Sequence, residues 1–371
     1  MQIAIDARFY GLEHAGLGRY TVNLIRELTK LDQENQYTLF VWEKYKDLDL
    51  PDNFSIKVVN AKHHSFGEQI LLASAIGIGK YDIVHFPHFI VPILNLTTPF
   101  IVTIHDLIKN EFDSKETSTL PLWQFAIKNQ LYRLDMWWAV NRSRAIISPS
   151  KHVKQRIIET YHISGEKIYP IYEGFDSTIT EISINSDSLS NQGVIKPYIL
   201  YVGKSYVHKQ VEFIIDELEN IPKNVALVLV GEKGIFWERT LARVKNKQVL
   251  NRVHHLGFVN DAVLASLYQN ALCFVSASLD EGFSLPPLEA INLKCPLILS
   301  DIPVHREIYQ DSAIYFDPRN HSELAEKVRL LAKNSQYFDK QISTGLDLIK
   351  SYNWGSMTKQ IINLYQNTQI K

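Results

Sequence analysis

Cysteine is almost missing from this sequence, which has only two in 371 residues, Cys273 and Cys295. Both lie in apolar runs, and two cysteines provide neither a disulfide framework nor the ligand spacing of a metal site. We expect both to be reduced residues of a hydrophobic core.

An excess of charge of either sign is missing as well. Lys and Arg total 39 and Asp and Glu total 40, a net charge of −1 at pH 7. A chain so balanced has no general attraction for nucleic acid, so no nucleic-acid partner is expected. Long apolar runs are also lacking, because a stretch such as 89–96 is too short to span a bilayer and contains Pro92. Asp6 and Arg8 do not fit a signal peptide, and the expected location is the cytoplasm.

What the chain does have is a regular alternation of short β-rich apolar runs with amphipathic stretches. This alternation is typical of βα units around parallel sheets. Strands are predicted at 3–5, 37–41, 55–58, 83–86, 100–104, 145–148 and 167–171, and then at 198–203, 225–230, 253–256, 272–275, 297–299 and 314–316. Helices are predicted near 18–29, 68–78, 120–141 and 151–161, with others between the later strands and at the tail.

A polar segment at residues 176–196, rich in Ser, Asn and Asp, interrupts this rhythm and is predicted to be a linker. The expected fold class is therefore α/β, with two doubly wound, Rossmann-like domains at 1–175 and 176–352 that face each other across a cleft. Ligands of open α/β sheets bind beyond the carboxyl ends of the strands. The loops that follow strands are thus where we expect the site residues.

The strongest functional pattern is DEGFSLPPLEA at residues 280–290, which follows an apolar strand and leads into a helix. Its two prolines fit the first helical turn, so the preceding amides are available to an anion. These amides belong to Gly282, Phe283, Ser284 and Leu285. Glu289, one turn into the helix, is placed to hold a pair of vicinal hydroxyls such as those of a ribose, and Glu281 lies nearer any group beyond the phosphates. A capped helix with acidic residues in its first turn is the alternative.

Glu281 and Glu289, eight positions apart, resemble the paired-glutamate motif of the retaining glycosyltransferase family 4, and the likeness covers nearly the whole chain. It implies the GT-B fold and a nucleotide-sugar donor held by the second domain. It also implies that a final helix near 357–366, preceded by Trp354, crosses back so that residues 353–371 pack on the first domain.

Two further segments of the second domain resemble family motifs. YVGK at 201–204, followed by His208 and Lys209, is similar to the phosphate-binding loop, which places Lys204 and Lys209 on the diphosphate. Many members have Arg at the position of Lys204, and Lys keeps the charge but not the planar fork. HHLGFV at 254–259 resembles the segment whose backbone meets the nucleotide base, which implicates Phe258 and Val259.

In the first domain, Gly16 and Gly18 lie where a helix begins after the first strand, and glycines there let a phosphate or sugar approach the backbone. They resemble the family's first glycine loop, and a tight turn is the alternative. His105 and Asp106 follow an apolar strand. The resemblance places His105 on the transferred sugar, with Asp106 orienting the imidazole or activating an acceptor hydroxyl. A structural histidine is the alternative.

A metal is not expected. Asp47-Leu48-Asp49 matches the Asp-x-Asp string of metal-using transferases, but it lies in a charged loop far from the other motifs, and no His or Cys cluster has ligand spacing. Two lysines and loop amides can neutralise a leaving diphosphate. The prediction is a donor substrate without metal or other cofactor.

The predicted reaction is transfer of a hexose from a nucleoside diphosphate to an acceptor hydroxyl of a glycan, polysaccharide or glycolipid, with retention by front-face attack. Residues 230–234 with Trp237 resemble bacterial mannosyltransferases, so GDP-mannose is slightly favoured. The missing third glycine of the dinucleotide fingerprint argues against a dehydrogenase. A nucleotide-sugar epimerase and a binding protein without turnover remain the alternatives.

The acceptor is addressed only by residues 128–156, where seven basic residues stand against Asp135 alone and enclose Trp137 and Trp138. Cations beside exposed aromatics suit an anionic bilayer, which predicts peripheral contact with the inner membrane face and a lipid-linked acceptor. In the alternative, both tryptophans are core residues of a long helix and the cations form its wet face.

Overall fold

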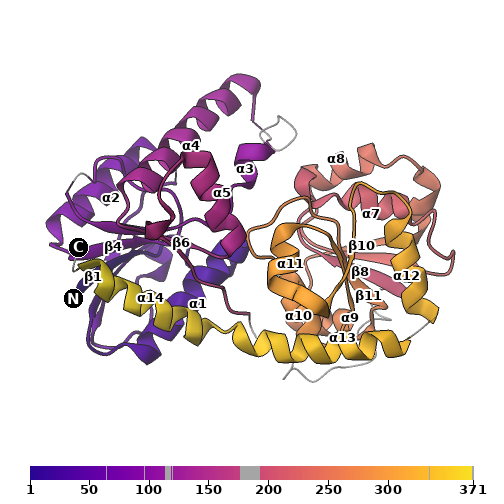
Figure 1. Cartoon of the computed structure of the whole chain (residues 1–371). Coiled ribbons are helices and arrows are strands. Elements are labelled where there is room, and N and C mark those ends of the chain that lie inside the picture. The colour runs from indigo at the N-terminus through magenta and orange to yellow at the C-terminus, as the bar shows by residue number, and fades with distance from the viewer. Residues whose placement is uncertain are drawn as a thin grey trace. The chain divides into compact units, whose positions relative to one another are not determined.

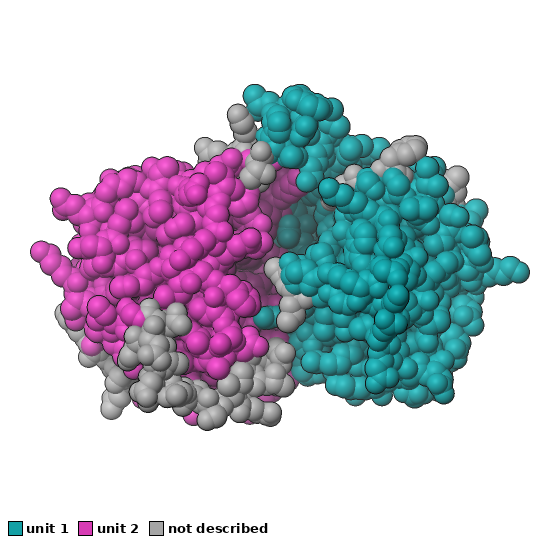
Figure 2. Space-filling view, turned by 180° about the vertical axis from the view of Figure 1, so that it is seen from behind, with its two compact units in different colours: residues 1–107, 120–174, 353–371 teal, residues 108–119, 175–352 magenta. Residues whose placement is uncertain are grey.

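The computed structural model describes residues 1–63, 65–95, 97–112, 118, 120–175, 193–333 and 335–369. These residues form two compact units, coloured separately in Figure 2. Unit 1 comprises Met1–Leu107, Leu120–Gly174 and Asn353–Lys371, and unit 2 comprises Ile108–Thr119 and Phe175–Tyr352. Most of the segment predicted as a linker, 176–192, lies outside the described residues.

Unit 1 is built on a seven-stranded parallel sheet of order β3-β2-β1-β4-β5-β6-β7 (Figure 1). Its strands are β1 (Gln2–Asp6), β2 (Gln36–Val41), β3 (Phe54–Val58), β4 (Ile83–Phe86), β5 (Phe100–Thr103), β6 (Ala145–Ser148) and β7 (Ile168–Pro170). Its helices are η1 (Leu12–His14), α1 (Ala15–Leu31), η2 (Glu43–Tyr45), α2 (Phe66–Ile78), α4 (Leu122–Arg142), α5 (Lys151–Tyr161), η4 (Gly165–Lys167) and α14 (Trp354–Gln369).

Unit 2 repeats the plan with six parallel strands in the order β10-β9-β8-β11-β12-β13. The strands are β8 (Tyr198–Val202), β9 (Ala226–Val230), β10 (Val253–Gly257), β11 (Cys273–Ser276), β12 (Leu297–Ser300) and β13 (Ile314–Phe316). The helices are α3 (Ile108–Glu111), η6 (Val207–Lys209), α7 (Val211–Glu217), α8 (Ile235–Arg243), η7 (Lys247–Arg252), α9 (Asp261–Asn270), α10 (Pro286–Asn292), α11 (Pro303–Tyr309), η8 (Gln310–Ser312), α12 (Glu323–Lys333), α13 (Ser335–Leu348) and η9 (Ile349–Ser351). The predicted class of two doubly wound α/β domains is confirmed.

The central strands are mostly apolar because helices cover both faces of each sheet, and the buried His85 on β4 is an exception. In β1, Ile3 and Ile5 pack into one core of unit 1, while Ala4 between them packs into the other. Cys273 and Cys295 are free thiols buried in unit 2, as predicted. Burial raises the pKa of both, which leaves them as inert packing groups.

The C-terminal helix belongs to unit 1, where α14 lies beside α1 (Figure 1). Trp354, Met357 and Ile361 are buried in the same core as Ile3 and Leu24. At Gly174 the backbone passes close to the start of α14, because a Cβ there would lie 2.2 Å from the backbone nitrogen of Trp354.

The long helix α4 turns apolar residues outward. Its buried side includes Tyr132, Met136 and Ala139, and Trp138 packs partly buried against the core. Trp137, however, is 53% exposed. The alternative in which both tryptophans are core residues is therefore wrong for Trp137. Within the described residues no helix is both long and apolar enough to cross a membrane.

Candidate functional site

The segment 280–290 lies at the carboxyl end of β11 in unit 2 and leads into α10, whose first turn contains both prolines as predicted. The helix is only seven residues long, and the residue before it, Leu285, makes no side-chain cap. An anion held here would therefore depend on the loop amides of Gly282, Phe283, Ser284 and Leu285 more than on a helix dipole.

Glu281 is buried and ion-paired with Lys209, which lies in η6 at the carboxyl end of β8. Ser278 Oγ donates to the same Oε1 at 2.7 Å. Burial alone would raise the pKa of Glu281, but the charge of Lys209 and its hydrogen bond more than offset it, so the net pKa is lowered. The structure thus brings two predicted residues together as an ionised pair.

Glu289 is buried in the first turn of α10, with 3% of its surface exposed. Its Oε2 accepts a hydrogen bond from the hydroxyl of Tyr268 on α9, at 3.2 Å. Tyr268 was not predicted from the sequence. It fixes one carboxylate oxygen, which pre-orients the group for the predicted contact with ribose hydroxyls.

Tyr309, the last residue of α11, holds the loop between Glu281 and Glu289 through two backbone carbonyl groups. Its hydroxyl donates to the carbonyl oxygen of Ser284 and lies 3.3 Å from that of Phe283. Ser284 has a φ of 72°, in the left-handed region that non-glycine residues rarely adopt. Strain of this kind persists only where the surroundings impose it, and Tyr309 supplies that constraint.

Lys204 follows β8, and its Nζ lies 3.1 Å from Glu232, with 42% of the side chain exposed. The loops carrying these residues pack backbone on backbone, since a Cβ on Gly231 would lie 2.1 Å from the carbonyl oxygen of Gly203. The YVGK and VGEKG segments therefore pack together at the carboxyl ends of the neighbouring strands β8 and β9.

Phe258 and Val259 follow β10. The Phe258 ring is 93% exposed, which is unusual for so large an apolar side chain. Val259 is half-buried. Their predicted place beside the nucleotide base stays a prediction.

In unit 1, Gly16 and Gly18 lie in the first turn of α1, not in a loop before it. A Cβ on Gly18 would lie 1.9 Å from the carbonyl oxygen of Gly11, so close packing explains this glycine. Nothing lies within 4 Å of a Cβ on Gly16. Of the two, only Gly16 lacks a packing reason within its own unit.

His105 follows β5, as predicted, and both ring nitrogens have partners. Nδ1 lies 2.9 Å from Oε1 of Glu173, which follows β7, and Nε2 lies 3.0 Å from the carbonyl oxygen of Pro87. Glu173 and Pro87 thus hold both ring nitrogens, and the predicted part of Asp106, in orienting the imidazole or activating an acceptor hydroxyl, stays a prediction. Asp106 itself is exposed. Burial lowers the pKa of His105, but the hydrogen bond and charge of Glu173 outweigh it, so the net pKa is raised.

A second histidine, His85 on β4, is fully buried beside this pair. Its Nδ1 lies 2.6 Å from the Tyr365 hydroxyl of α14, and its Nε2 lies 3.0 Å from Thr103 Oγ1. Thr103 also lies 3.3 Å from the hydroxyl of Tyr20, whose ring meets His105 edge-on. Burial, and next the charge of His105, lowers the pKa of His85 to about 3, so His85 is neutral.

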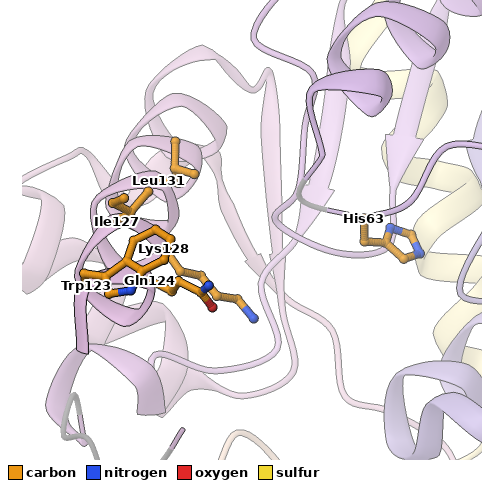
Figure 3. Close-up of a pocket in the computed structure, with 6 residues that line it drawn as sticks. All are labelled: His63, Trp123, Gln124, Ile127, Lys128 and Leu131. Carbon is orange, nitrogen blue, oxygen red and sulfur yellow. The ribbon is translucent and has the colours of Figure 1, made fainter. Parts of the chain in front are cut away.

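A pocket of about 310 Å³ opens between α4 and the chain after β3 (Figure 3). It is lined by His63, Trp123, Gln124, Ile127, Lys128 and Leu131. No predicted site residue lines it. Among the described residues, no three His, Cys, Asp or Glu side chains are grouped as a metal site would require.

Glu173, Tyr268 and Tyr309 were missed because each acts through a partner distant in sequence. Glu173 had a usable signal, since it directly follows a predicted strand and therefore lies at the carboxyl edge of the sheet. Tyr268 and Tyr309 are on helices, where nothing in the pattern separates a buried hydroxyl that binds the site from one that packs.

Two family models match the chain. The model for glycosyl transferases group 1 matches residues 188–346, and that for Glycosyltransferase Family 4 matches 14–178. The O-antigen chain mannosyltransferase RfbU of Salmonella typhimurium is 25% identical over 294 residues, which cover 79% of this chain and 76% of the relative. The O-antigen chain mannosyltransferase B of Escherichia coli is 22% identical, with 95% and 96% covered.

Among solved structures, Anabaena HepE in complex with UDP and glucose superposes with a TM-score of 0.76 at 16% identity. The match covers 99% of this chain and 100% of that one. At this identity the likeness establishes the shared fold.

Proposed function

Because the chain belongs to the family 4 glycosyltransferases of the GT-B fold, we propose that it moves a hexose, with mannose favoured, from a nucleoside-diphosphate sugar to an acceptor hydroxyl with retention. The expected product is a glycan, polysaccharide or glycolipid. The mannosyltransferase names of the relatives at 22–25% identity support mannose. HepE was solved with UDP, so the base is a separate question.

The ion pair between the buried Glu281 and the half-buried Lys209 carries the proposal. An ammonium group has three N–H donors, so Lys209 can bind Glu281 and still reach a diphosphate. Together with Lys204 it would neutralise the charge that grows on the leaving group, without a metal. Glu281 is ionised but already bound through Oε1 by Lys209 and Ser278. This supports a role on the transferred sugar and front-face attack, in which the departing phosphate oxygen takes the acceptor's proton.

A panel of UDP-, GDP-, ADP- and dTDP-sugars, each with and without acceptor glycans, tests the reaction. Proton NMR of the anomeric centre should show transfer with retention from one donor, and excess EDTA should leave the rate nearly unchanged. An inverted product, or loss of turnover with EDTA that magnesium restores, contradicts the mechanism. A changed sugar nucleotide without acceptor would indicate an epimerase, and binding without any product a protein that has lost turnover.

The exposed apolar side of α4, part of which also lines the pocket of Figure 3, supports peripheral contact with an anionic membrane and hence a lipid-linked acceptor. Leu122 begins the helix, and its other five exposed large apolar residues recur every three or four positions, which places them on one side of it. They are Trp123, Ile127, Leu131, Leu134 and Trp137. Lys128 lies within this row, and further cations follow toward residue 156. Each cation near an anionic surface contributes about 1 kcal/mol, and tryptophan suits the headgroup layer.

Sedimentation with vesicles of anionic or neutral lipid tests this contact. The full-length chain should bind anionic vesicles at low salt and lose binding as salt rises. Trp123→Gln combined with Trp137→Gln should weaken binding severalfold, whereas Leu330→Gln, an exposed apolar residue on α12, should not. No binding at low salt would favour a soluble acceptor.

A further inference from the structure

Glu173 is a buried carboxylate that none of the sequence motifs includes. Only 7% of its surface is exposed, and its Oε1 lies 2.9 Å from Nδ1 of His105. At the opposite end of the ring, Nε2 lies 3.0 Å from the carbonyl oxygen of Pro87. A carbonyl oxygen has no proton to give, so Nε2 must carry one. The other nitrogen faces a carboxylate, which binds best to a protonated Nδ1.

We propose that Glu173 is a positioning residue that keeps His105 a doubly protonated imidazolium with both N–H bonds occupied. His105 then contributes a fixed positive charge and neither takes nor gives a proton during the reaction. Its part in the proposed transfer is electrostatic, which deepens the role of this histidine and rests on the proposed function.

The groups around His105 agree with a cation at this place. Asp106, the next residue, adds a second negative charge that favours the charged ring. Tyr20 on α1 meets the ring edge-on at 4.7 Å between centroids, and burial raises the pKa of its hydroxyl, so it stays neutral. His85 on β4 is neutral as well. Among the described residues, Glu173 and then Asp106 are the charged groups that raise the pKa of His105, and their attraction outweighs the effect of burial.

The pairing with Glu173 also explains why His105, which follows β5, differs from His85 on the adjacent strand β4. Both ring nitrogens of His85 contact hydroxyl groups. A hydroxyl can donate to the bare nitrogen of a neutral ring or accept from its N–H, so such partners suit a neutral ring. His105 ends on a carboxylate and a carbonyl, which only accept. The hydrogen-bond partners alone therefore predict a neutral ring for His85 and a positively charged ring for His105.

Nitrogen-15 NMR of histidine-labelled protein tests the charge state directly. In the wild type both ring nitrogens of His105 should give protonated signals through pH 7 and above, with assignment from the spectrum of His105→Asn. Glu173→Gln keeps the shape and a hydrogen bond but removes the charge, so His105 should become neutral at pH 7 with its proton on Nε2. Tyr365→Phe, which removes a partner of His85, is the matched control and should leave the His105 signals unchanged.

Two results would overturn the proposal. One is a wild-type His105 whose Nδ1 is unprotonated at pH 7 because the proton lies on Glu173. The other is a ring that stays doubly protonated in Glu173→Gln. If Glu173→Gln does not fold, Glu173→Asp, which keeps the charge, should retain the protonated ring, and a neutral ring there would count equally against the pair.

Activity adds a second readout. In Glu173→Gln we expect kcat/KM at pH 8 to fall about tenfold, the scale of one charge-assisted hydrogen bond, and to recover toward pH 6 as the ring regains its proton. The wild type should show no such recovery. If the NMR results hold but no nucleotide sugar is turned over by the wild type, the proposed function fails and the pair stands. A flat profile in Glu173→Gln would show that the charge does not act in the reaction.

Discussion

The sheet of unit 2 repeats the order of the first six strands of unit 1, but the two units use their cations differently. In unit 1 both N–H bonds of His105 point at protein acceptors, Glu173 and the carbonyl of Pro87. In unit 2 Lys204 and Lys209 each face one carboxylate, Glu232 and Glu281, and an ammonium keeps further donors for a ligand. Beyond the carboxyl ends of the strands, unit 1 thus has a cation whose N–H bonds are all taken by the protein. At the corresponding place, unit 2 has cations that keep N–H donors for a ligand. This difference fits a donor diphosphate bound mainly by unit 2.

Replacing Lys209 should have the largest effect. It removes the N–H groups that we propose bind the diphosphate, and it leaves the buried Glu281 without its cation. For Lys209→Met we expect kcat/KM to fall about 10²–10³-fold, as when a preorganised donor to a developing negative charge is lost. Steady-state kinetics with the best donor of the panel measures this. Lys30→Met, which breaks an exposed pair on α1, is the control and should be near wild type. A loss of less than tenfold would move the diphosphate contact away from Lys209.

Glu289 should affect binding more than turnover. Its Oε2 is held by Tyr268, and the predicted contact is to two ribose hydroxyls. Glu289→Ala should weaken nucleotide binding by about 1.5–3 kcal/mol, the range for hydrogen bonds to a charged group. Calorimetry on folded protein measures this. Tyr268→Phe, which only loosens the carboxylate, should cost less, and equal affinity in Glu289→Ala and wild type would remove the ribose role.

Acid should destabilise the fold through histidines that are buried in the neutral form. Burial lowers the pKa of His305 to about 4 and that of His85 to about 3, against about 6.5 in an unfolded chain. Between those values the unfolded state binds a proton that the folded state does not, so the free energy of unfolding falls as the pH drops below about 6.5. The raised pKa of His105 has the opposite sign, and its contribution is lost as the pH rises.

Urea unfolding at pH 7 and pH 5 measures this effect. His305→Asn should reduce the loss between the two pH values by on the order of 1–2 kcal/mol. His162→Asn, a change at the exposed end of α5, should leave the loss as in wild type. An unchanged pH dependence in His305→Asn would mean that His305 is protonated in the folded state.

The strands could be predicted because the interior strands of a parallel sheet are mostly apolar on both faces, so runs such as β9 and β11 stand out from their surroundings. Which side of α4 faces inward could not be predicted from the sequence. Trp137 and Trp138 are adjacent, and apolar residues occur around much of the helix. The pairing of Glu173 with His105 joins strand ends 68 positions apart, and local pattern does not contain it. The family motifs found Lys209 and Glu281, but not the tyrosines that fix the loop and Glu289.

The two glycines of α1 should differ in their effect on stability, and Gly16→Ala should have the smallest effect of these variants. Gly16→Ala meets no atom within 4 Å inside its unit, and alanine favours a helix over glycine by up to about 1 kcal/mol, so stability should stay or rise slightly. Gly18→Ala would drive a Cβ against the carbonyl of Gly11 and should lower stability by about 1–3 kcal/mol. Urea unfolding measures both. If Gly16 admits the donor as predicted, Gly16→Ala should nevertheless raise KM for the nucleotide sugar, because a methyl group would stand where the substrate approaches the backbone. An unchanged KM in this stable variant would show that Gly16 only begins the helix.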